Sequence, residues 1–126
     1  MEGRSLHKSD ARCKCPLCYH GCMAIDLTIP REFKRRALRA MPRRRIAKVV
    51  LYGSRARGDA RADSDWDLAV FVHGRPTDRD LSILSDVAYD LLMETGVFIQ
   101  AFPFAARHEQ RQSTFYGNVR KDGVPI

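Results

Sequence analysis

Two short apolar runs, separated by a turn rich in Gly and Arg, constrain the fold of this chain more than any other feature. The first run covers residues 46–52 and is followed directly by Gly53, and the second covers residues 65–72. Short apolar runs with β-branched residues, bounded by turn residues, are typical of buried strands. The sequence therefore predicts two neighbouring strands joined by a turn over residues 53–64.

The length and composition suit one small domain. The chain has 126 residues, of which 44% are hydrophobic, and its net charge is +7. That hydrophobic share supplies a core and argues against disorder throughout. No apolar run approaches the roughly 20 residues that a bilayer crossing needs, and the N-terminus has no secretory signal. We therefore expect a cytoplasmic protein without a membrane partner.

All four cysteines lie in the N-terminal segment, and residues 23–126 contain none, which fits a reducing compartment. Four thiolates can hold zinc, but ligands spaced this closely do not match the usual paired arrangement. Patterned sequence begins only after Met23. We expect residues 1–22 to be an unstructured leader, with a Cys-rich zinc-binding extension as the less favoured alternative, and residues 23–126 to form the domain. The candidate zinc ligands are Cys13, Cys15, Cys18 and Cys22.

Hydrophobic periodicity predicts the remaining elements. A helix is expected over residues 31–41, after Pro30 and before Pro42, and a longer one over residues 77–95, stopped by Gly96. Residues 97–102 read as a third strand ended by Pro103, and residues 105–121 as a weakly patterned helix before a turn at residues 122–123. The order of elements predicts an α/β (α+β) domain with a short mixed sheet flanked by helices.

The turn between the first two strands has the pattern Gly-Ser, ten residues, then Asp-x-Asp. Gly53 permits a close backbone approach, and Ser54 is expected to begin a short helix, so their N–H groups and the Ser hydroxyl suit a triphosphate. Alternate residues of a strand share a face, so Asp65 and Asp67 project together while Trp66 points away. Paired carboxylates suit Mg²⁺, as metal-assisted nucleotidyl transfer requires. The alternative is that the aspartates of this region only form turns.

This stretch, LYGSRARGDARADSDWDLAVFV, resembles the signature of the minimal nucleotidyltransferases in the DNA polymerase β superfamily. The resemblance is specific over residues 46–72 and extends in element order to residue 102. It implies a polymerase-β-like domain that transfers a nucleoside monophosphate from an NTP. Gly53 and Ser54 would contact the triphosphate, and Asp65 and Asp67 would be catalytic and bind two Mg²⁺ ions. Arg55 or Arg57 would neutralise phosphate.

One position departs from the family pattern. Relatives often have a third carboxylate on the following strand, where it helps to deprotonate the attacking hydroxyl. The only polar residue of the matching strand here is Gln100, and an amide is not a general base. Glu94 is near in sequence but lies before Gly96 and would have to reach into the site.

Two functions therefore compete. The first is an Mg²⁺-dependent enzyme that transfers AMP from ATP to a hydroxyl on a partner protein, because many relatives are antitoxins paired with a HEPN-domain toxin. The second is a catalytically degenerate binding module that neutralises such a toxin by contact, which Gln100 favours. A nucleic-acid binder that uses the Arg-rich residues 31–48 is the least favoured interpretation, because a solvated helix face explains that segment equally well.

Overall fold

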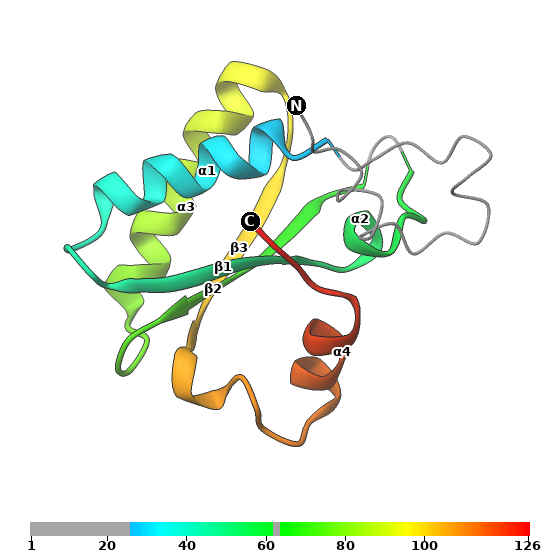
Figure 1. Ribbon diagram of the computed structural model, residues 1–126. Coiled ribbons are helices and arrows are strands. Elements are labelled where there is room, and N and C mark those ends of the chain that lie inside the picture. Colours follow the sequence, from blue (N-terminus) through cyan, green and yellow to red (C-terminus); the bar gives the residue numbers. More distant parts are fainter. Residues whose placement is uncertain (1–25, 62–63) are drawn as a thin grey trace, which may run out of the picture.

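The computed structural model describes residues 26–61 and 64–126 of the chain. The proposed leader and its four cysteines lie outside these residues, as do residues 62–63 (Figure 1). In order, the elements are α1 (Thr28–Ala40), β1 (Ile46–Tyr52), α2 (Ser54–Arg57), β2 (Trp66–Val72), α3 (Asp78–Thr95), β3 (Ile99–Ala105), η3 (Ala106–His108), α4 (Thr114–Asp122) and β4 (Val124–Pro125).

The four strands form one mixed sheet in the order β3-β2-β1-β4, which confirms the expected α/β class. β1 is antiparallel to β2, so the turn between them brings Tyr52 opposite Asp67. β3 is parallel to β2, because α3 crosses between them, and Gln100 pairs with Asp67. The central position of β2 thus places Asp67 between residues of both neighbouring strands.

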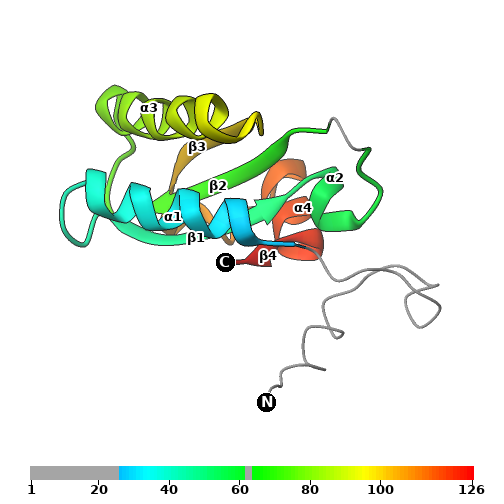
Figure 2. The ribbon, with the colours of Figure 1, turned by 90° about the horizontal axis from the view of Figure 1, so that it is seen from above.

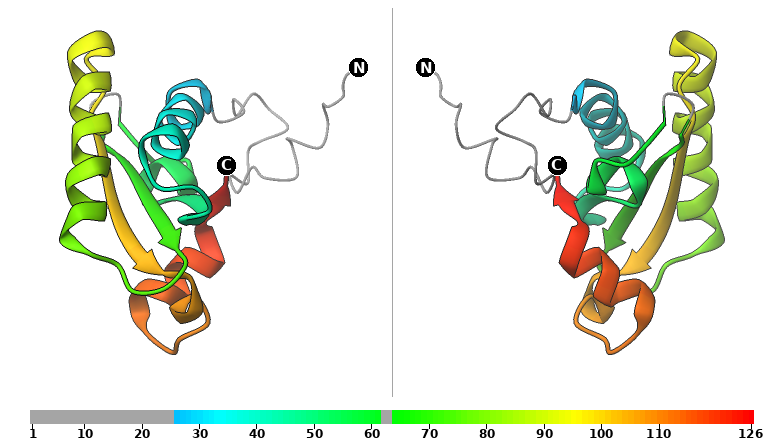
Figure 3. Two further views of the ribbon diagram at one scale, coloured as in Figure 1. Left: turned by 90° about the vertical axis from the view of Figure 1, so that its left-hand side faces the viewer. Right: turned by 90° about the vertical axis from the view of Figure 1, so that its right-hand side faces the viewer.

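Helices cover both faces of the sheet (Figures 2 and 3). α1 and α3 pack on one face, where Phe33 of α1 and Leu84 of α3 join the larger core with Leu68 of β2. α4 packs on the other face through Val119, against a smaller cluster that includes Phe71. None of the helices within residues 26–61 and 64–126 has the length and apolar character that crossing a membrane requires.

The structure corrects the expected end of β3. The strand does not stop at Pro103 but continues to Ala105. The N–H of Trp66 donates to the carbonyl of Phe98 at 3.0 Å, so the even-numbered residues of β3 face β2 in the parallel ladder. Pro103 therefore faces the outer edge of the sheet, where a missing N–H breaks no ladder hydrogen bond.

Other expected boundaries also shift. α1 begins at Thr28, three residues earlier than the periodicity indicates. The tail is not a helix from residue 105, because a short 3₁₀ turn follows β3 and α4 starts only at Thr114, where the Ser113 hydroxyl accepts a hydrogen bond from the N–H of Tyr116 at 3.1 Å. After Gly123 the chain does not simply turn but adds β4, which pairs with β1.

The first turn of α3 is fixed by a buried ion pair. The Asp80 side chain accepts a hydrogen bond from the Thr77 N–H at 2.9 Å, and the Thr77 hydroxyl accepts one from the Asp80 N–H at 3.1 Å. The Arg45 guanidinium bonds both carboxylate oxygens of Asp80, at 2.6 and 3.2 Å. Asp80 is the one buried charged residue among the described residues, with 4% exposed, and every side of its carboxylate is partnered.

Candidate active site

Gly53 makes the sharp turn out of β1. Its φ of +79° is unfavourable for any residue with a side chain. The Gly53 carbonyl accepts hydrogen bonds from the N–H groups of Ala56 and Arg57, at 3.1 and 3.0 Å, which closes the short helix α2. Ser54 is the first residue of that helix, as the sequence predicts.

The carboxylate of Asp67 lies directly against this turn. A Cβ atom on Gly53 would stand 2.5 Å from Asp67 Oδ2, closer than nonbonded atoms approach, and 3.3 Å from Asp67 Cγ, which is a tight contact. Only glycine leaves room for the carboxylate here. The Gly-Ser turn and the second aspartate of the Asp-x-Asp pattern therefore form one site, although thirteen residues of sequence separate Gly53 from Asp67.

The two aspartates occupy the start of β2. Asp65 lies just before the strand and Asp67 is its second residue, so the expectation that Asp65 belongs to the strand is off by one position. Both carboxylates are half-buried, whereas Trp66 between them is 9% exposed and belongs to the core. The alternation of the extended chain thus places the carboxylates on one side and the indole on the other.

The electrostatics of Asp67 are unfavourable in the free protein. Its burial, and then the neighbouring charge of Asp65, raise the pKa of Asp67, while Arg57 opposes the rise. Among the described residues, none donates a hydrogen bond to the Asp67 carboxylate. Burial and the Asp67 charge also raise the pKa of the Tyr52 phenol, so Tyr52 stays neutral near pH 7. A cation placed between the carboxylates would relieve this repulsion.

The two candidate arginines differ in position. Arg57 is exposed and reaches Asp59 at 3.3 Å, which leaves it at the mouth of the site. Arg55 is half-buried, donates to the Ser64 carbonyl at 2.8 and 3.2 Å, and stacks with its guanidinium carbon 4.6 Å from the Trp66 ring centroid. Arg55 therefore holds the far end of the loop in place, and Arg57 is the arginine whose charge acts on Asp67.

Gln100, which the sequence predicts at the third-carboxylate position of the family pattern, pairs with Asp67 in the sheet, and its Nε2 donates a hydrogen bond to Asp65 Oδ2 at 3.0 Å. Glu94 does not reach the site: Arg36 holds both of its carboxylate oxygens, at 2.8 and 2.9 Å, where α1 meets α3. Glu94 therefore does not reach in to supply a third acid in this structure. Among the described residues, the acidic groups placed at this site are Asp65 and Asp67.

This donor set fits a hard cation that arrives with further ligands. Within the described ranges, no group of three or more His, Cys, Asp or Glu side chains gathers to hold a metal. Two carboxylates with a raised pKa on one of them suit Mg²⁺, which is commonly held by one or two carboxylates together with substrate phosphates.

Sequence reasoning missed the roles of Tyr52 and Trp66. Tyr52 pairs with Asp67 across the antiparallel ladder. Its ring packs edge-on against the Phe115 ring, with the two ring centroids 5.4 Å apart. The signal was present, because a hairpin around Gly53 must set the residue before the turn near the second aspartate. The Arg55–Trp66 stack has no comparable local signal, because it depends on the path of the loop between α2 and β2.

Intramolecular ion pairs use much of the basic segment 31–48. Arg35 and Arg36 pair with Glu32, at 2.5 and 2.7 Å, and Lys48 pairs with Glu109. Arg45 is bound to Asp80, as described above. These pairs offset the charge of four of the nine basic side chains in this segment, so they reduce its positive charge without removing it.

Comparison with known proteins shows what this chain is similar to. A Methanocaldococcus jannaschii protein named as a protein adenylyltransferase is 33% identical over 89 residues, which is 69% of this chain and 84% of the relative. Two solved structures share the fold at 20% identity. One is described as a nucleotidyltransferase from Sulfolobus solfataricus (TM-score 0.56, 98% of this chain and 87% of that chain).

The other solved structure is a toxin–antitoxin with AMP-PNP (TM-score 0.52, 75% of this chain and 69% of that chain). The family described as "Polymerase beta, Nucleotidyltransferase" matches residues 38–119, which include β1, both aspartates and β3. This chain is a member of the polymerase β nucleotidyltransferase family.

Proposed function

We propose that this protein is an Mg²⁺-dependent adenylyltransferase that transfers AMP from ATP to a hydroxyl group on a partner protein, as the antitoxin of a toxin–antitoxin pair. The observation that carries the proposal is the packing of the Asp67 carboxylate against Gly53, because it joins a phosphate-binding turn to a carboxylate pair. The name of the archaeal relative and the AMP-PNP in the toxin–antitoxin neighbour favour adenylyl transfer.

In this proposal the backbone of Gly53 and Ser54 holds the triphosphate and Arg57 neutralises part of its charge. Asp65 and Asp67 hold Mg²⁺, which supplies charge neutralisation at the α-phosphate and the leaving group. Gln100 holds Asp65 in place through its 3.0 Å hydrogen bond. Arg55 acts indirectly, by anchoring the loop through the Ser64 carbonyl.

The transfer forms a bond between the acceptor oxygen and the α-phosphorus and breaks the bond to the bridging oxygen, so pyrophosphate leaves. The acceptor proton must also leave. Gln100 cannot take it, because an amide is not a base at neutral pH. The proton therefore goes to solvent or to a group that the acceptor itself brings.

The test is nucleotide transfer by the purified full chain, alone and with the product of the neighbouring gene. Each of the four α-labelled NTPs is supplied with Mg²⁺, and wild type is compared with Asp65→Ala/Asp67→Ala. Asp78→Asn, which removes an exposed carboxylate from α3, is the matched control. We expect label from ATP on a protein, its loss in the double variant and its retention in the control. Label retained without both aspartates would refute the proposed site.

The second candidate function is neutralisation of a HEPN-type toxin by contact, without catalysis. Gln100 favours it, because this side chain occupies the third-carboxylate position and bonds Asp65 as a donor. Under this alternative no NTP labels a protein, while the complex with the partner forms equally well with wild type and with Asp65→Ala/Asp67→Ala.

A further inference from the structure

Exposed apolar side chains gather on one side of this molecule. Among the described residues, six large apolar side chains are exposed, and only Leu38 lies on α1. The other five belong to α3 or adjoin or lie on β3: Leu81, Tyr89, Met93, Phe98 and Phe102. Their exposed fractions run from 37% to 63%, which is unusual for residues so close together.

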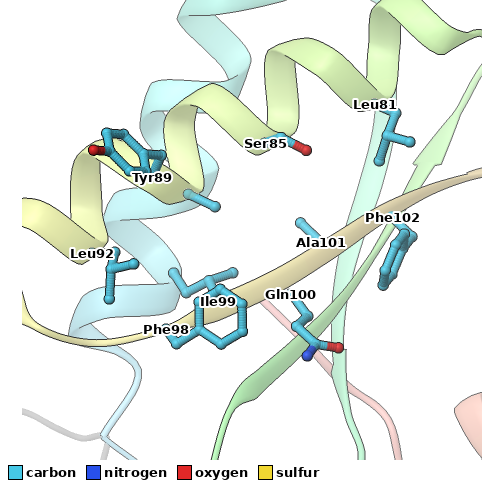
Figure 4. Close-up of a pocket in the computed structure, with 10 residues that line it drawn as sticks. Leu81, Ser85, Tyr89, Leu92, Phe98, Ile99, Gln100, Ala101 and Phe102 are labelled. Atoms are coloured by element: carbon cyan, nitrogen blue, oxygen red, sulfur yellow. The ribbon is translucent and has the colours of Figure 1, made fainter.

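A groove of about 400 Å³ runs between these two elements. Figure 4 shows the side chains of α3 and of the strand that line it. We call it the α3–β3 groove; its lining residues are Leu81, Ser85, Ala88, Tyr89, Leu92 and residues 98–102.

The groove and the candidate active site share one residue. Gln100 lines the groove and also donates the hydrogen bond to Asp65. Whatever binds along the groove therefore lies one side chain away from the carboxylate pair. Such a position suits a protein whose hydroxyl is to be modified.

The charge beside the groove indicates what kind of partner fits. α3 has five acidic side chains and one basic one in a chain whose net charge is +7. Asp86 and Asp90 are exposed, one turn apart, and each follows a groove residue by one position. Neither has an ion-pair partner in the part of the chain that the structure describes. A partner with Lys or Arg next to its apolar side chains would complement this row.

The backbone excludes one mode of binding. Ile99 and Ala101 have their backbone groups on the outer edge of the sheet, yet these residues are only 2% and 7% exposed. An added strand would need these groups to be open. The occupant must therefore bind through its side chains, as an amphipathic helix does in an apolar groove.

From these observations we propose that the α3–β3 groove docks a basic amphipathic helix of the partner protein. The identification of this partner as the acceptor rests on the proposed function, but docking itself does not require transfer. A second copy of this chain fits less well, because a two-fold contact through the groove would set the two Asp86–Asp90 rows against each other.

The test uses a fluorescein-labelled helical peptide of Leu and Lys, with Leu at three- and four-residue steps, and a matched peptide with Glu in place of Lys. Binding to the full chain is followed by anisotropy. We expect the Leu/Lys peptide to bind and the Leu/Glu peptide to bind at least about tenfold more weakly. Phe98→Ser/Phe102→Ser should weaken Leu/Lys binding by about tenfold or more.

Two further variants test the acidic side chains beside the groove and an exposed apolar side chain outside it. Asp86→Asn/Asp90→Asn, which changes only exposed carboxylates, should weaken the Leu/Lys peptide roughly three- to tenfold and leave the fold intact. Leu38→Ser removes the exposed apolar residue of α1 and should change binding less than about twofold. Equal binding of the two peptides, unchanged binding by the Phe98/Phe102 variant, or no binding by wild type would overturn the proposal.

Two more outcomes distinguish helix docking from nucleotide transfer and from dimerisation. Asp65→Ala/Asp67→Ala should bind the Leu/Lys peptide like wild type, so a failure of nucleotide transfer leaves docking supported. A wild-type dimer in sedimentation that Phe98→Ser/Phe102→Ser dissociates would identify the occupant as a second copy and overturn the proposed helix.

Discussion

Asp80 and Asp67 carry the same charge in the same small domain and have opposite surroundings. Arg45 holds Asp80 through two hydrogen bonds, with help from Thr77, and lowers the pKa of the Asp80 carboxyl. Burial and the adjacent Asp65 raise the pKa of Asp67, and no described residue donates a hydrogen bond to it. The Asp80 carboxylate is therefore neutralised by a partner within the fold, whereas the Asp67 carboxylate is left without a hydrogen-bond donor among the described residues.

The difference separates a charge that the fold neutralises from one that we propose to be functional. Asp80 lies in the first turn of α3 and, through Arg45, ties that helix to the chain just before β1, so its partners all belong to the protein. Asp67 faces the Gly53 turn, so its charge remains available to a cation that arrives with a nucleotide. Perturbed carboxylates occur in both roles, and here the pKa of Asp80 is lowered by its partners whereas the pKa of Asp67 is raised by burial.

The largest effect is expected from Asp80→Ala. Its removal leaves the Arg45 guanidinium, whose side chain is 21% exposed, without its carboxylate and removes the Asp80 half of the capping box of α3. We expect the free energy of unfolding to fall by about 3–5 kcal/mol, measured by urea denaturation. A loss below about 1 kcal/mol would mean that the pair does not stabilise the fold.

The difference in free energy of unfolding between wild type and Asp80→Ala should depend on pH. The folded-state pKa of Asp80 lies below its ordinary value of 3.8, so its stabilisation is complete above that value and is lost as the pH falls through the folded-state pKa. Wild type and Asp80→Ala should therefore differ most near neutral pH and converge below pH 3.8.

The next largest effect is expected at Gly53. Gly53→Ala places a Cβ 2.5 Å from Asp67 Oδ2 at a φ of +79°, so the carboxylate must move. We expect a loss of about 2–3 kcal/mol in stability and no detectable nucleotide transfer. Gly58→Ala is the matched control: its φ is +84° but nothing lies within 4 Å of the added atom. It should cost about 1 kcal/mol and retain transfer. Equal effects of the two variants would show that the contact with Asp67 is unimportant.

A smaller effect is expected from Gln100→Ala, which removes the 3.0 Å hydrogen bond to Asp65. Since a hydrogen bond to a carboxylate contributes about 1 kcal/mol or somewhat more, we expect Mg²⁺-dependent ATP affinity to weaken roughly three- to tenfold. Calorimetric titration measures this directly. Gln110→Ala, at an exposed position beyond β3, should leave the affinity unchanged. Unaltered affinity in Gln100→Ala would show that Asp65 needs no such support.

The smallest effect sharpens the contrast with Asp80. Asp67→Asn removes a charge that burial and Asp65 disfavour, so thermal unfolding of the nucleotide-free protein should be unchanged or stabilised by about 0.5 kcal/mol. Asp80→Asn, by comparison, should destabilise. A clear loss of stability in Asp67→Asn would mean that the Asp67 charge has a structural partner after all.

The sequence was sufficient where the determinants are local. The limits of β1, the start of α2 at Ser54 and the shared side of Asp65 and Asp67 all follow from residue types and the two-residue period of a strand. These are the features that place the candidate site, so its main residues can be predicted from the sequence.

The remaining features depend on neighbours that are distant in sequence. Pro103 lies within β3 because this strand is at the edge of the sheet, and β4 exists because residues 124–125 pair with β1. The bond from Gln100 to Asp65 and the capture of Glu94 by Arg36 likewise join separate elements. Periodicity reports which side of an element is apolar, but not which element will cover it.

The position of Trp66 has a practical consequence. It is the chain's single tryptophan, it lies between the two candidate metal ligands, and the Arg55 guanidinium stacks on its ring at 4.6 Å. Indole emission responds to nearby charge and to stacking. The protein therefore contains a native optical reporter at the site in question, and ligand binding can be followed in unlabelled, unmodified protein.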